Sequence, residues 1–272
     1  MVIVERTCEP RADVAAAAFV DRVARWIMEG LDGRRPSLLV VDDEIDTCRN
    51  LADILEEFDY HVDVAESGEA ALDLVRRTAY DIALLDLKMP GMDGMTLCRE
   101  IRKLQSSTVA LIVTAYATPR TQSEVLAAGA LEVLPKPVDL GRLLPLLQNV
   151  VSQPLVLIVD DDDALRQSLW DLLRHQQYRV GLAESWEDAN RHLGSQNYEV
   201  VLVDLRLPDG SGRDVLESIR REHPDARTVL ITGHRDEMTA GGEEIPADAV
   251  CYKPFDMPQL LETIDRLTHA VR

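Results

Sequence analysis

The chain has 272 residues, a formal net charge of −19 and a pI near 4.7. Nucleic-acid phosphates are bound by clustered Lys and Arg, so this acidic balance argues against direct nucleic-acid binding. The four cysteines include no C-x-x-C pair, which indicates neither a disulfide framework nor a zinc site and fits a reducing, cytoplasmic location. The apolar stretch Val14–Val20 is too short for a membrane span or a secretion signal, so we expect no membrane partner.

Residues 1–36 form an N-terminal segment in which an amphipathic helix is predicted. Asp13 is a suitable helix cap, and it is followed by an apolar stripe at helical spacing: Phe19, Val23, Trp26 and Ile27. Packing of this helix on the next domain, formation of a homodimer and docking to another protein are alternatives that the pattern leaves open.

A repeat fills the remainder of the chain. The string Leu38-Leu-Val-Val-Asp-Asp43 returns as Leu155-Val-Leu-Ile-Val-Asp-Asp161, and later landmarks return with it. Three pairs of landmarks are 118 residues apart and a fourth is 117 apart: Asp42 and Asp160, Asp86 and Asp204, Thr114 and Thr232, then Lys136 and Lys253. Repeated units of about this length, 117–118 residues, are long enough to bury hydrophobic cores of their own. We therefore expect two duplicated domains, at residues 37–151 and 152–272.

Each unit contains continuous apolar runs. They are Leu38–Val41, Ile82–Leu85, Val109–Val113 and Leu131–Leu134 in the first unit, and Leu155–Val159, Val200–Val203, Thr228–Ile231 and Ala249–Tyr252 in the second. Such runs are typical of strands buried on both faces of a parallel sheet, and segments of helical period lie between them. The alternation predicts an α/β fold with two doubly wound parallel five-stranded sheets.

Polar residues follow the apolar runs of the first unit. Asp42 and Asp43 follow the first run, Asp86 the second, and Thr114 and Lys136 the last two. In doubly wound sheets, ligands bind in the crevice at the carboxyl ends of the strands. Converging carboxylates need raised pKa values or a hard cation. The second unit repeats the arrangement with Asp160, Asp161, Asp204, Thr232 and Lys253.

Longer strings around two of these aspartates carry a family likeness. They are Leu84-Leu-Asp86-Leu-Lys-Met-Pro-Gly-Met-Asp-Gly94 and Leu202-Val-Asp204-Leu-Arg-Leu-Pro-Asp-Gly-Ser-Gly212, followed by Thr114-Ala115 with Lys136-Pro137 and by Thr232-Gly233 with Lys253-Pro254. This pattern resembles the receiver domain of two-component response regulators over about residues 38–150 and 155–271. The resemblance implies the flavodoxin-like receiver fold, and the Lys-Pro pairs admit a cis bond.

The resemblance also implies a role for each landmark. Asp86 and Asp204 would accept a phosphoryl group from a histidine kinase or a histidine phosphotransfer protein. Mg²⁺ would be held by Asp42, Asp43, Asp86 and the backbone carbonyl of Lys88, and by Asp160, Asp161, Asp204 and the carbonyl of Arg206. Thr114 and Thr232 would bind a phosphoryl oxygen, while Lys136 and Lys253 neutralise its charge. Such a protein is not an enzyme for a separate substrate and catalyses only its own phosphorylation and dephosphorylation.

The chain departs from the receiver pattern in three places. Val133 and Val250 stand three residues before the Lys, where many receivers carry an aromatic switch residue. The fourth helix of the second unit, at Thr239–Pro246, contains two glycines and a proline, whereas Arg120–Ala128 of the first unit is more helical. Pro145 predicts a kink or a late start of the fifth helix in the first unit. We therefore expect no aromatic switching and two different output surfaces.

Two other functions compete with phosphorelay signalling. One receiver could be a dimerisation or docking platform, and the weaker fourth helix nominates the second unit. A Mg²⁺-dependent phosphatase with an Asp nucleophile is the other alternative. Haloacid-dehalogenase-like phosphatases place a second Asp two residues after the nucleophile, and here Lys88 and Arg206 occupy those positions.

The output is expected to be a protein contact or an onward phosphoryl transfer, since no residue follows Arg272. Lys88, Tyr116, Arg206 and His234 flank the two sites, and their differences predict two different phosphoryl lifetimes. The downstream partner and the kinase are not specified by the sequence.

Overall fold

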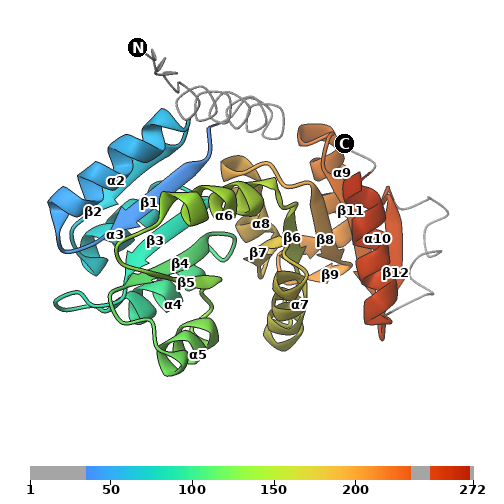
Figure 1. Cartoon of the computed structure of the whole chain (residues 1–272). Helices are drawn as coiled ribbons and strands as arrows, with labels where there is room; N and C mark the ends of the chain where they lie inside the picture. Colours follow the sequence, from blue (N-terminus) through green and yellow to red (C-terminus); the bar gives the residue numbers. More distant parts are fainter. Residues whose placement is uncertain (1–34, 234–245, 270–272) are drawn as a thin grey trace, which may run out of the picture.

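A computed structural model describes residues 35–233 and 246–269 of the chain (Figure 1). These residues form two five-stranded sheets with helices on both faces. The prediction of two doubly wound parallel sheets is confirmed. The predicted N-terminal helix, His234 and most of the predicted fourth helix of the second unit lie outside the described residues.

The first sheet has the strand order β2-β1-β3-β4-β5, and every neighbouring pair is parallel. Its strands are β1 (Ser37–Val41), β2 (His61–Ala65), β3 (Ile82–Asp86), β4 (Val109–Thr114) and β5 (Glu132–Pro135). Its helices are α2 (Ile45–Glu57), α3 (Gly68–Val75), α4 (Gly94–Leu104), α5 (Pro119–Ala127) and α6 (Leu140–Ser152). Helices α2 and α6 cover one face of the sheet, and α3, α4 and α5 cover the other.

The second sheet repeats the first, with the order β7-β6-β8-β11-β12. Its strands are β6 (Leu155–Val159), β7 (Arg179–Ala183), β8 (Val200–Asp204), β11 (Arg227–Thr232) and β12 (Ala249–Tyr252). Its described helices are α7 (Asp163–His175), α8 (Trp186–Ser195), α9 (Gly212–Glu222) and α10 (Met257–His269). A short antiparallel hairpin joins β9 (Arg206–Leu207) to β10 (Gly210–Ser211).

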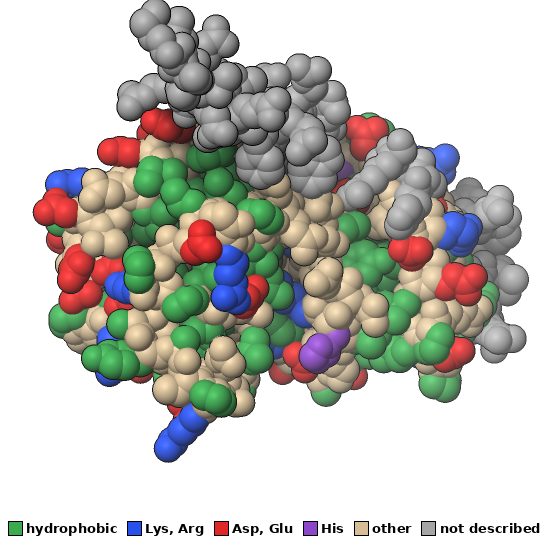
Figure 2. Space-filling model, in the orientation of Figure 1, with side chains coloured by type: hydrophobic (Ala, Val, Ile, Leu, Met, Phe, Trp, Pro, Cys, Tyr) green, Lys and Arg blue, Asp and Glu red, His purple; other side chains and the backbone are tan. Residues whose placement is uncertain are grey.

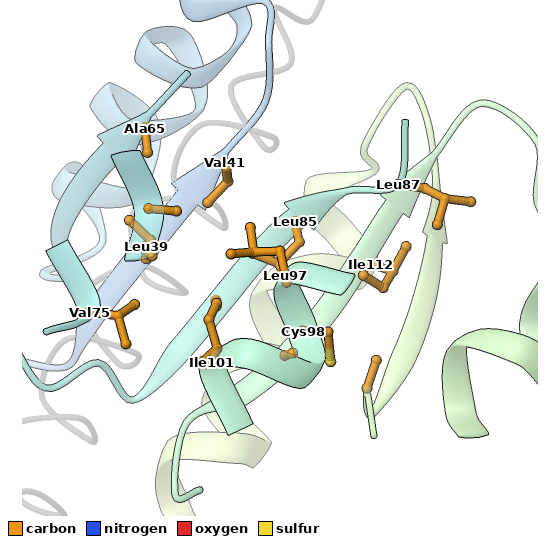
Figure 3. Packing of buried hydrophobic residues seen from close by; sticks show 14 of the residues in the cluster. Leu39, Val41, Ala65, Val75, Leu85, Leu87, Leu97, Cys98, Ile101 and Ile112 are labelled. Carbon is orange, nitrogen blue, oxygen red and sulfur yellow. The ribbon is translucent and has the colours of Figure 1, made fainter. Parts of the chain in front are cut away.

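The central strands are buried because helices cover both of their faces. The apolar runs in β3, β6 and β8 are buried throughout, as predicted, and the aspartates that end β3 and β8 are buried as well. Figure 3 shows how α4 packs on the first sheet, with Leu97, Cys98 and Ile101 close to Leu85 and Ile112 of the strands. Helix α4 thereby covers the strand that ends in Asp86.

Two edge strands and one proline differ from the expectations. β2 and β7 were not among the predicted apolar runs, because His61, Asp63, Arg179 and Gly181 interrupt them. Helix α6 begins at Leu140 and Pro145 lies inside it, so a start delayed to the proline is wrong. Its side-chain cap at Asp139 explains the early start, since the carboxylate accepts from Gly141 N.

The two halves of the chain meet at the end of the first sheet opposite to Asp86. Asp81, just before β3, is fully buried and forms an ion pair with Arg179 at the start of β7. Ser106, after α4, accepts hydrogen bonds on its hydroxyl from Leu182 N of β7 (2.7 Å) and on its carbonyl from the Trp170 indole (3.3 Å). This interface is polar and buried, and α7 faces the first sheet and its helices across it (Figure 1).

Over the described ranges, 35–233 and 246–269, no helix combines the length and the apolar character needed to cross a membrane. The face shown in Figure 2 carries acidic side chains over both halves of the molecule, and its described residues form no extended basic area in that view. That surface agrees with the acidic composition of the sequence.

Candidate phosphoacceptor sites

The first candidate site lies where β1, β3 and β5 end. Asp42 follows β1, Asp86 is the last residue of β3 and Lys136 follows β5. Lys136 Nζ lies 2.6 Å from Asp42 Oδ2 and 2.9 Å from Asp86 Oδ1. One ammonium group therefore bridges two carboxylates at the carboxyl edge of the sheet, as the sequence predicts.

Asp43 adds a third carboxylate to this site. Oxygen atoms of Asp42, Asp43 and Asp86 all lie within 4.8 Å of one another, and Asp43 is exposed while the other two are buried. Three hard oxygen ligands at this spacing fit a cation such as Mg²⁺. Lys88 N donates to Asp86 Oδ2 (3.2 Å), which fixes the loop after β3 next to the carboxylate.

Burial and charge act against each other at this site. Desolvation by burial raises the pKa of Asp86, and the hydrogen bond from Lys136 only partly opposes this effect. Burial also disfavours the charge on Lys136, but its hydrogen bonds to Asp42 and Asp86 outweigh it and raise the pKa of the ammonium. The charged lysine is thus part of the site at neutral pH.

The second candidate site repeats these contacts at the ends of β6, β8 and β12. Lys253 Nζ lies 2.7 Å from Asp160 Oδ2 and 2.7 Å from Asp204 Oδ1. Arg206 N donates to Asp204 Oδ2 (2.7 Å), as Lys88 N does at Asp86. Burial raises the pKa of Asp160, and the contacts of Lys253 with the two carboxylates raise the pKa of the lysine.

Thr114 and Thr232 end the strands next to these carboxylates and are almost fully buried. The Thr114 hydroxyl accepts from Tyr116 N (3.2 Å), so it is already held by its own loop. The Lys136–Pro137 and Lys253–Pro254 peptide bonds are both cis. Lys88 lies over the exposed ring of Tyr116, with 4.7 Å between Nζ and the ring centroid.

The family of the chain follows from its comparison with known proteins. The family model of the response regulator receiver domain matches residues 38–148 and 156–265. The chain belongs to the response regulator receiver family. We call the two matched halves receiver 1 and receiver 2.

Two similar relatives match most of this chain. The response regulator receiver protein Anae109_2439 of Anaeromyxobacter sp. (strain Fw109-5) is 34% identical over 229 residues, which cover 84% of this chain and 94% of the relative. The signal transduction histidine-protein kinase BarA of Shigella flexneri is 33% identical over 261 residues, which cover 87% of this chain but 26% of that kinase.

A third relative and a solved structure match one receiver each. The transcriptional regulatory protein ZraR of Escherichia coli (strain K12) is 39% identical over 115 residues, or 42% of this chain and 26% of that protein. A CheY-like receiver domain from Methanospirillum hungatei JF-1 is 29% identical and covers 43% of this chain and 94% of its own, with a TM-score of 0.42. The chain therefore contains two receiver domains of the kind found in two-component signalling proteins.

Two glycines position the helices that follow the candidate phosphoacceptors. A Cβ on Gly94 would lie 2.2 Å from the carbonyl oxygen of Asp86, and one on Gly212 would lie 2.3 Å from that of Asp204. Only glycine permits this approach of helix to strand. Both glycines lie within the family strings, whose pattern alone does not indicate this role.

The two receivers differ beneath their acidic residues. The Cys48 thiol of receiver 1 lies 3.5 Å from the carbonyl oxygen of Asp42. At the matching position of receiver 2, the Arg166 guanidinium donates to the carbonyl of Asp160 and to the carboxylate of Asp163. Among the described residues, Asp42, Asp43 and Asp86 are the one group of three carboxylates that meets within 4.8 Å. The carboxylate oxygens of Asp160, Asp161 and Asp204, the matching residues of receiver 2, do not all lie within that distance of one another.

The structure therefore brings each predicted lysine to its pair of aspartates in both receivers. It places the backbone nitrogens of Lys88 and Arg206 against the aspartates, while the predicted ligand role of their carbonyls stays a prediction. The sequence pattern does not reveal Arg166 or the interface residues Asp81, Ser106, Trp170 and Arg179. A comparison of matching positions in the repeat points to three of them, because Cys48, Ala52 and His61 stand opposite Arg166, Trp170 and Arg179.

Proposed function

We propose that the chain is a phosphorelay signalling protein that accepts phosphoryl groups on Asp86 and Asp204. The observation that carries this proposal is the pair of matching lysine contacts, because each lysine spans two carboxylates at the carboxyl edge of its sheet. The units that would be phosphorylated are residues 37–151 and 152–272. Membership of the receiver family supports the same chemistry.

In the proposed reaction, an Asp86 oxygen attacks the phosphorus atom of a donor, and the bond from phosphorus to the donor's leaving atom breaks. Lys136, held 2.9 Å from Asp86, stabilises negative charge on the transferred group. Thr114, buried at the end of β4, would donate a hydrogen bond to a phosphoryl oxygen. Asp204, Lys253 and Thr232 have the same roles in receiver 2.

Mg²⁺ fits the donor set of receiver 1 best, because three carboxylates converge there. Asp42, Asp43 and Asp86 would hold the ion, together with the Lys88 carbonyl. Asp160, Asp161, Asp204 and the Arg206 carbonyl would hold it in receiver 2. A bound cation offsets the repulsion between the carboxylates and an anionic phosphoryl group.

The phosphoryl donor would be a histidine kinase or a histidine phosphotransfer protein. The similarity of the chain to part of BarA, a histidine-protein kinase, supports a place in such a relay. Output would pass by protein contact to a downstream partner, with a possible homodimer, and we place the protein in the cytoplasm. Differences at Lys88, Tyr116 and Arg206 would give the two aspartyl phosphates different lifetimes.

The test is to incubate the full chain with acetyl phosphate and Mg²⁺ and to follow its intact mass. We expect two phosphoryl groups on the wild-type chain, one on Asp86→Asn, one on Asp204→Asn and none on the double variant. Omission of Mg²⁺ should remove labelling at both sites.

Asp53 and Asp171 provide matched controls. They occupy the same position in the two receivers, and both are exposed on a helix. Asp53→Asn and Asp171→Asn should label like the wild-type chain. A wild-type chain that gains no phosphoryl group while a known receiver is labelled in parallel would contradict the proposal.

A second candidate function assigns phosphorylation to receiver 1 alone, with receiver 2 as a docking platform. The specific observation in its favour is that carboxylate oxygens of Asp42, Asp43 and Asp86 all lie within 4.8 Å of one another in receiver 1. In this case Asp204→Asn would leave the extent of labelling unchanged. Labelling of both aspartates at similar rates would exclude it.

A further inference from the structure

The two candidate sites are connected by a pair of helices that touch each other. Helix α4 starts at the first site, because Gly94 packs on the backbone of Asp86 and Gly94 N donates to Leu87 O (3.1 Å). Arg102 lies eight residues further along α4, or about 12 Å from its start. Helix α4 thus runs from the candidate phosphoacceptor of receiver 1 toward receiver 2.

Helix α7 starts at the second site in a similar way. Asp162, its N-cap residue, donates its backbone N–H to Asp160 Oδ1 (2.9 Å), the partner of Lys253. Arg166 also joins the first turn of α7 to the carbonyl of Asp160. Gln167 and Trp170 follow on the same helix, about 6–11 Å from its start.

The two helices meet through Arg102. Its guanidinium donates to Gln167 Oε1 (2.6 Å) and stacks on the Trp170 ring, with 3.6 Å from Cζ to the ring centroid. The Trp170 indole donates to the carbonyl of Ser106, which follows α4, and Ser107 donates to Gln196 of receiver 2 (2.7 Å). The C-terminal end of α4 is therefore held by receiver 2 at several points.

We infer that occupancy of the Asp86 site changes the affinity of the Asp204 site through the contact of Arg102 with Gln167 and Trp170. This inference rests on the proposed phosphorylation of both receivers. A phosphoryl group and its cation at Asp86 act on the backbone that Gly94 touches, so the start of α4 responds to them. Helices in a close-packed interior move as rigid bodies, so a shift at Gly94 reaches Arg102. The reverse effect must be of the same size, because coupling between binding sites is reciprocal.

The test uses beryllium trifluoride with Mg²⁺ as the probe and isothermal titration of the full chain. Asp204→Asn reports the affinity of receiver 1 alone, and Asp86→Asn reports that of receiver 2 alone. We expect the wild-type isotherm to differ from the sum of these two, with the second affinity changed by about fivefold or more. In Arg102→Ala the isotherm should equal the sum of the corresponding single-site variants.

Arg99→Ala is the matched control, because Arg99 lies on the same helix, carries the same charge and is exposed. It should keep the wild-type coupling. Gln167→Ala is the second uncoupling variant, and circular dichroism checks that every variant is folded. If Arg102→Ala does not fold, Gln167→Ala decides the matter.

Trp170 offers an independent signal. The chain has three tryptophans, so Trp26→Phe and Trp186→Phe leave Trp170 as the sole tryptophan. With Asp204→Asn added, its emission should change in proportion to the occupancy of receiver 1. Two sites that bind the probe additively, with constant Trp170 emission, would overturn the coupling alone. A chain that binds no probe at either site would overturn the proposed function as well.

Discussion

The first four strands of receiver 1 recur in receiver 2 at a constant spacing along the sequence, but the two receivers differ where they contact each other. Each of the first four strands of one sheet lies 118 residues from its counterpart, and both lysines contact two aspartates. The edge strand β2 carries an exposed His61, whereas β7 carries a buried Arg179 at the same position. Ala52 of α2 is replaced by Trp170 of α7. The lysine–aspartate contacts are thus repeated at the carboxyl edges of both sheets, whereas one edge strand and one helix of receiver 2 differ where they contact receiver 1.

Removal of the interface ion pair should have the largest effect on this arrangement. Asp81→Asn leaves Arg179 buried without its carboxylate, and breaking a buried pair in this way costs about 3–5 kcal/mol. The free energy of unfolding, measured by urea denaturation, should fall by this amount. Asp81→Asn with Arg179→Gln removes both charges and should recover part of the loss. Equal losses in the single and the double variant would show that the charge on Arg179 is not the cause.

Loss of either site lysine should affect phosphorylation of its own receiver. Lys136→Ala removes the ammonium group that contacts Asp42 and Asp86 and would stabilise the transferred group, so labelling of Asp86 by acetyl phosphate should slow by about 10²-fold or more. Lys253→Ala should do the same at Asp204, and each change should affect the other receiver much less. Peptide-resolved mass spectrometry measures both rates. Lys103→Ala removes an exposed lysine of α4 and serves as the control, and equal rates in Lys103→Ala and Lys136→Ala would contradict the assigned role.

A glycine in β7 distinguishes the packing of the two receivers. The Tyr80 hydroxyl of receiver 1 donates to Asp63 (2.6 Å), whereas Gly181 occupies the position of Asp63 in receiver 2. A Cβ at residue 181 would lie 2.4 Å from the hydroxyl of the buried Tyr198. Gly181→Ala should therefore destabilise the protein by about 1–3 kcal/mol in a denaturation experiment. Adding Tyr198→Phe removes the hydroxyl but leaves Cε1 and Cζ of the ring 2.9 and 3.0 Å from the added Cβ, so it should restore only part of this loss. A Gly181→Ala variant as stable as the wild-type chain would exclude the clash.

The smallest effect concerns the response of receiver 2 to acid. Burial lowers the pKa of His192, which has its Nδ1 3.1 Å from the Tyr198 hydroxyl, and receiver 1 has Leu74 at that position. The unfolded chain binds a proton more readily than the folded one, so this histidine contributes full stability above the unfolded pKa of about 6.5 and less as the pH falls below it. His192→Leu should flatten the fall in unfolding free energy between pH 7 and pH 5, by at most about 1.4 kcal/mol per pH unit. An unchanged slope would show that His192 keeps its ordinary pKa.

The central strands and the site residues could be predicted because their pattern is local. Each buried strand is a continuous apolar run, and the polar residue after it lies at the carboxyl edge of the sheet. The edge strands β2 and β7 could not be found in this way, because Asp63 and Arg179 make them half polar. The interface is a tertiary feature, since Asp81 and Arg179 are 98 residues apart and each looks like an ordinary surface residue in the sequence. The late start of α6 that Pro145 predicts is wrong, because the cap at Asp139 starts the helix before the proline.

The connection between the receivers has a consequence for every variant of the interface. Only Gln153 and Pro154 separate the end of α6 from β6, and Arg179 N donates to Pro154 O (3.0 Å). So short a tether keeps each receiver at a very high effective concentration near the other. The interface therefore needs little intrinsic affinity to remain closed. A substitution such as Arg102→Ala can change how the receivers communicate without letting them separate, and dissociation of isolated receivers in solution would greatly overstate its effect in the intact chain.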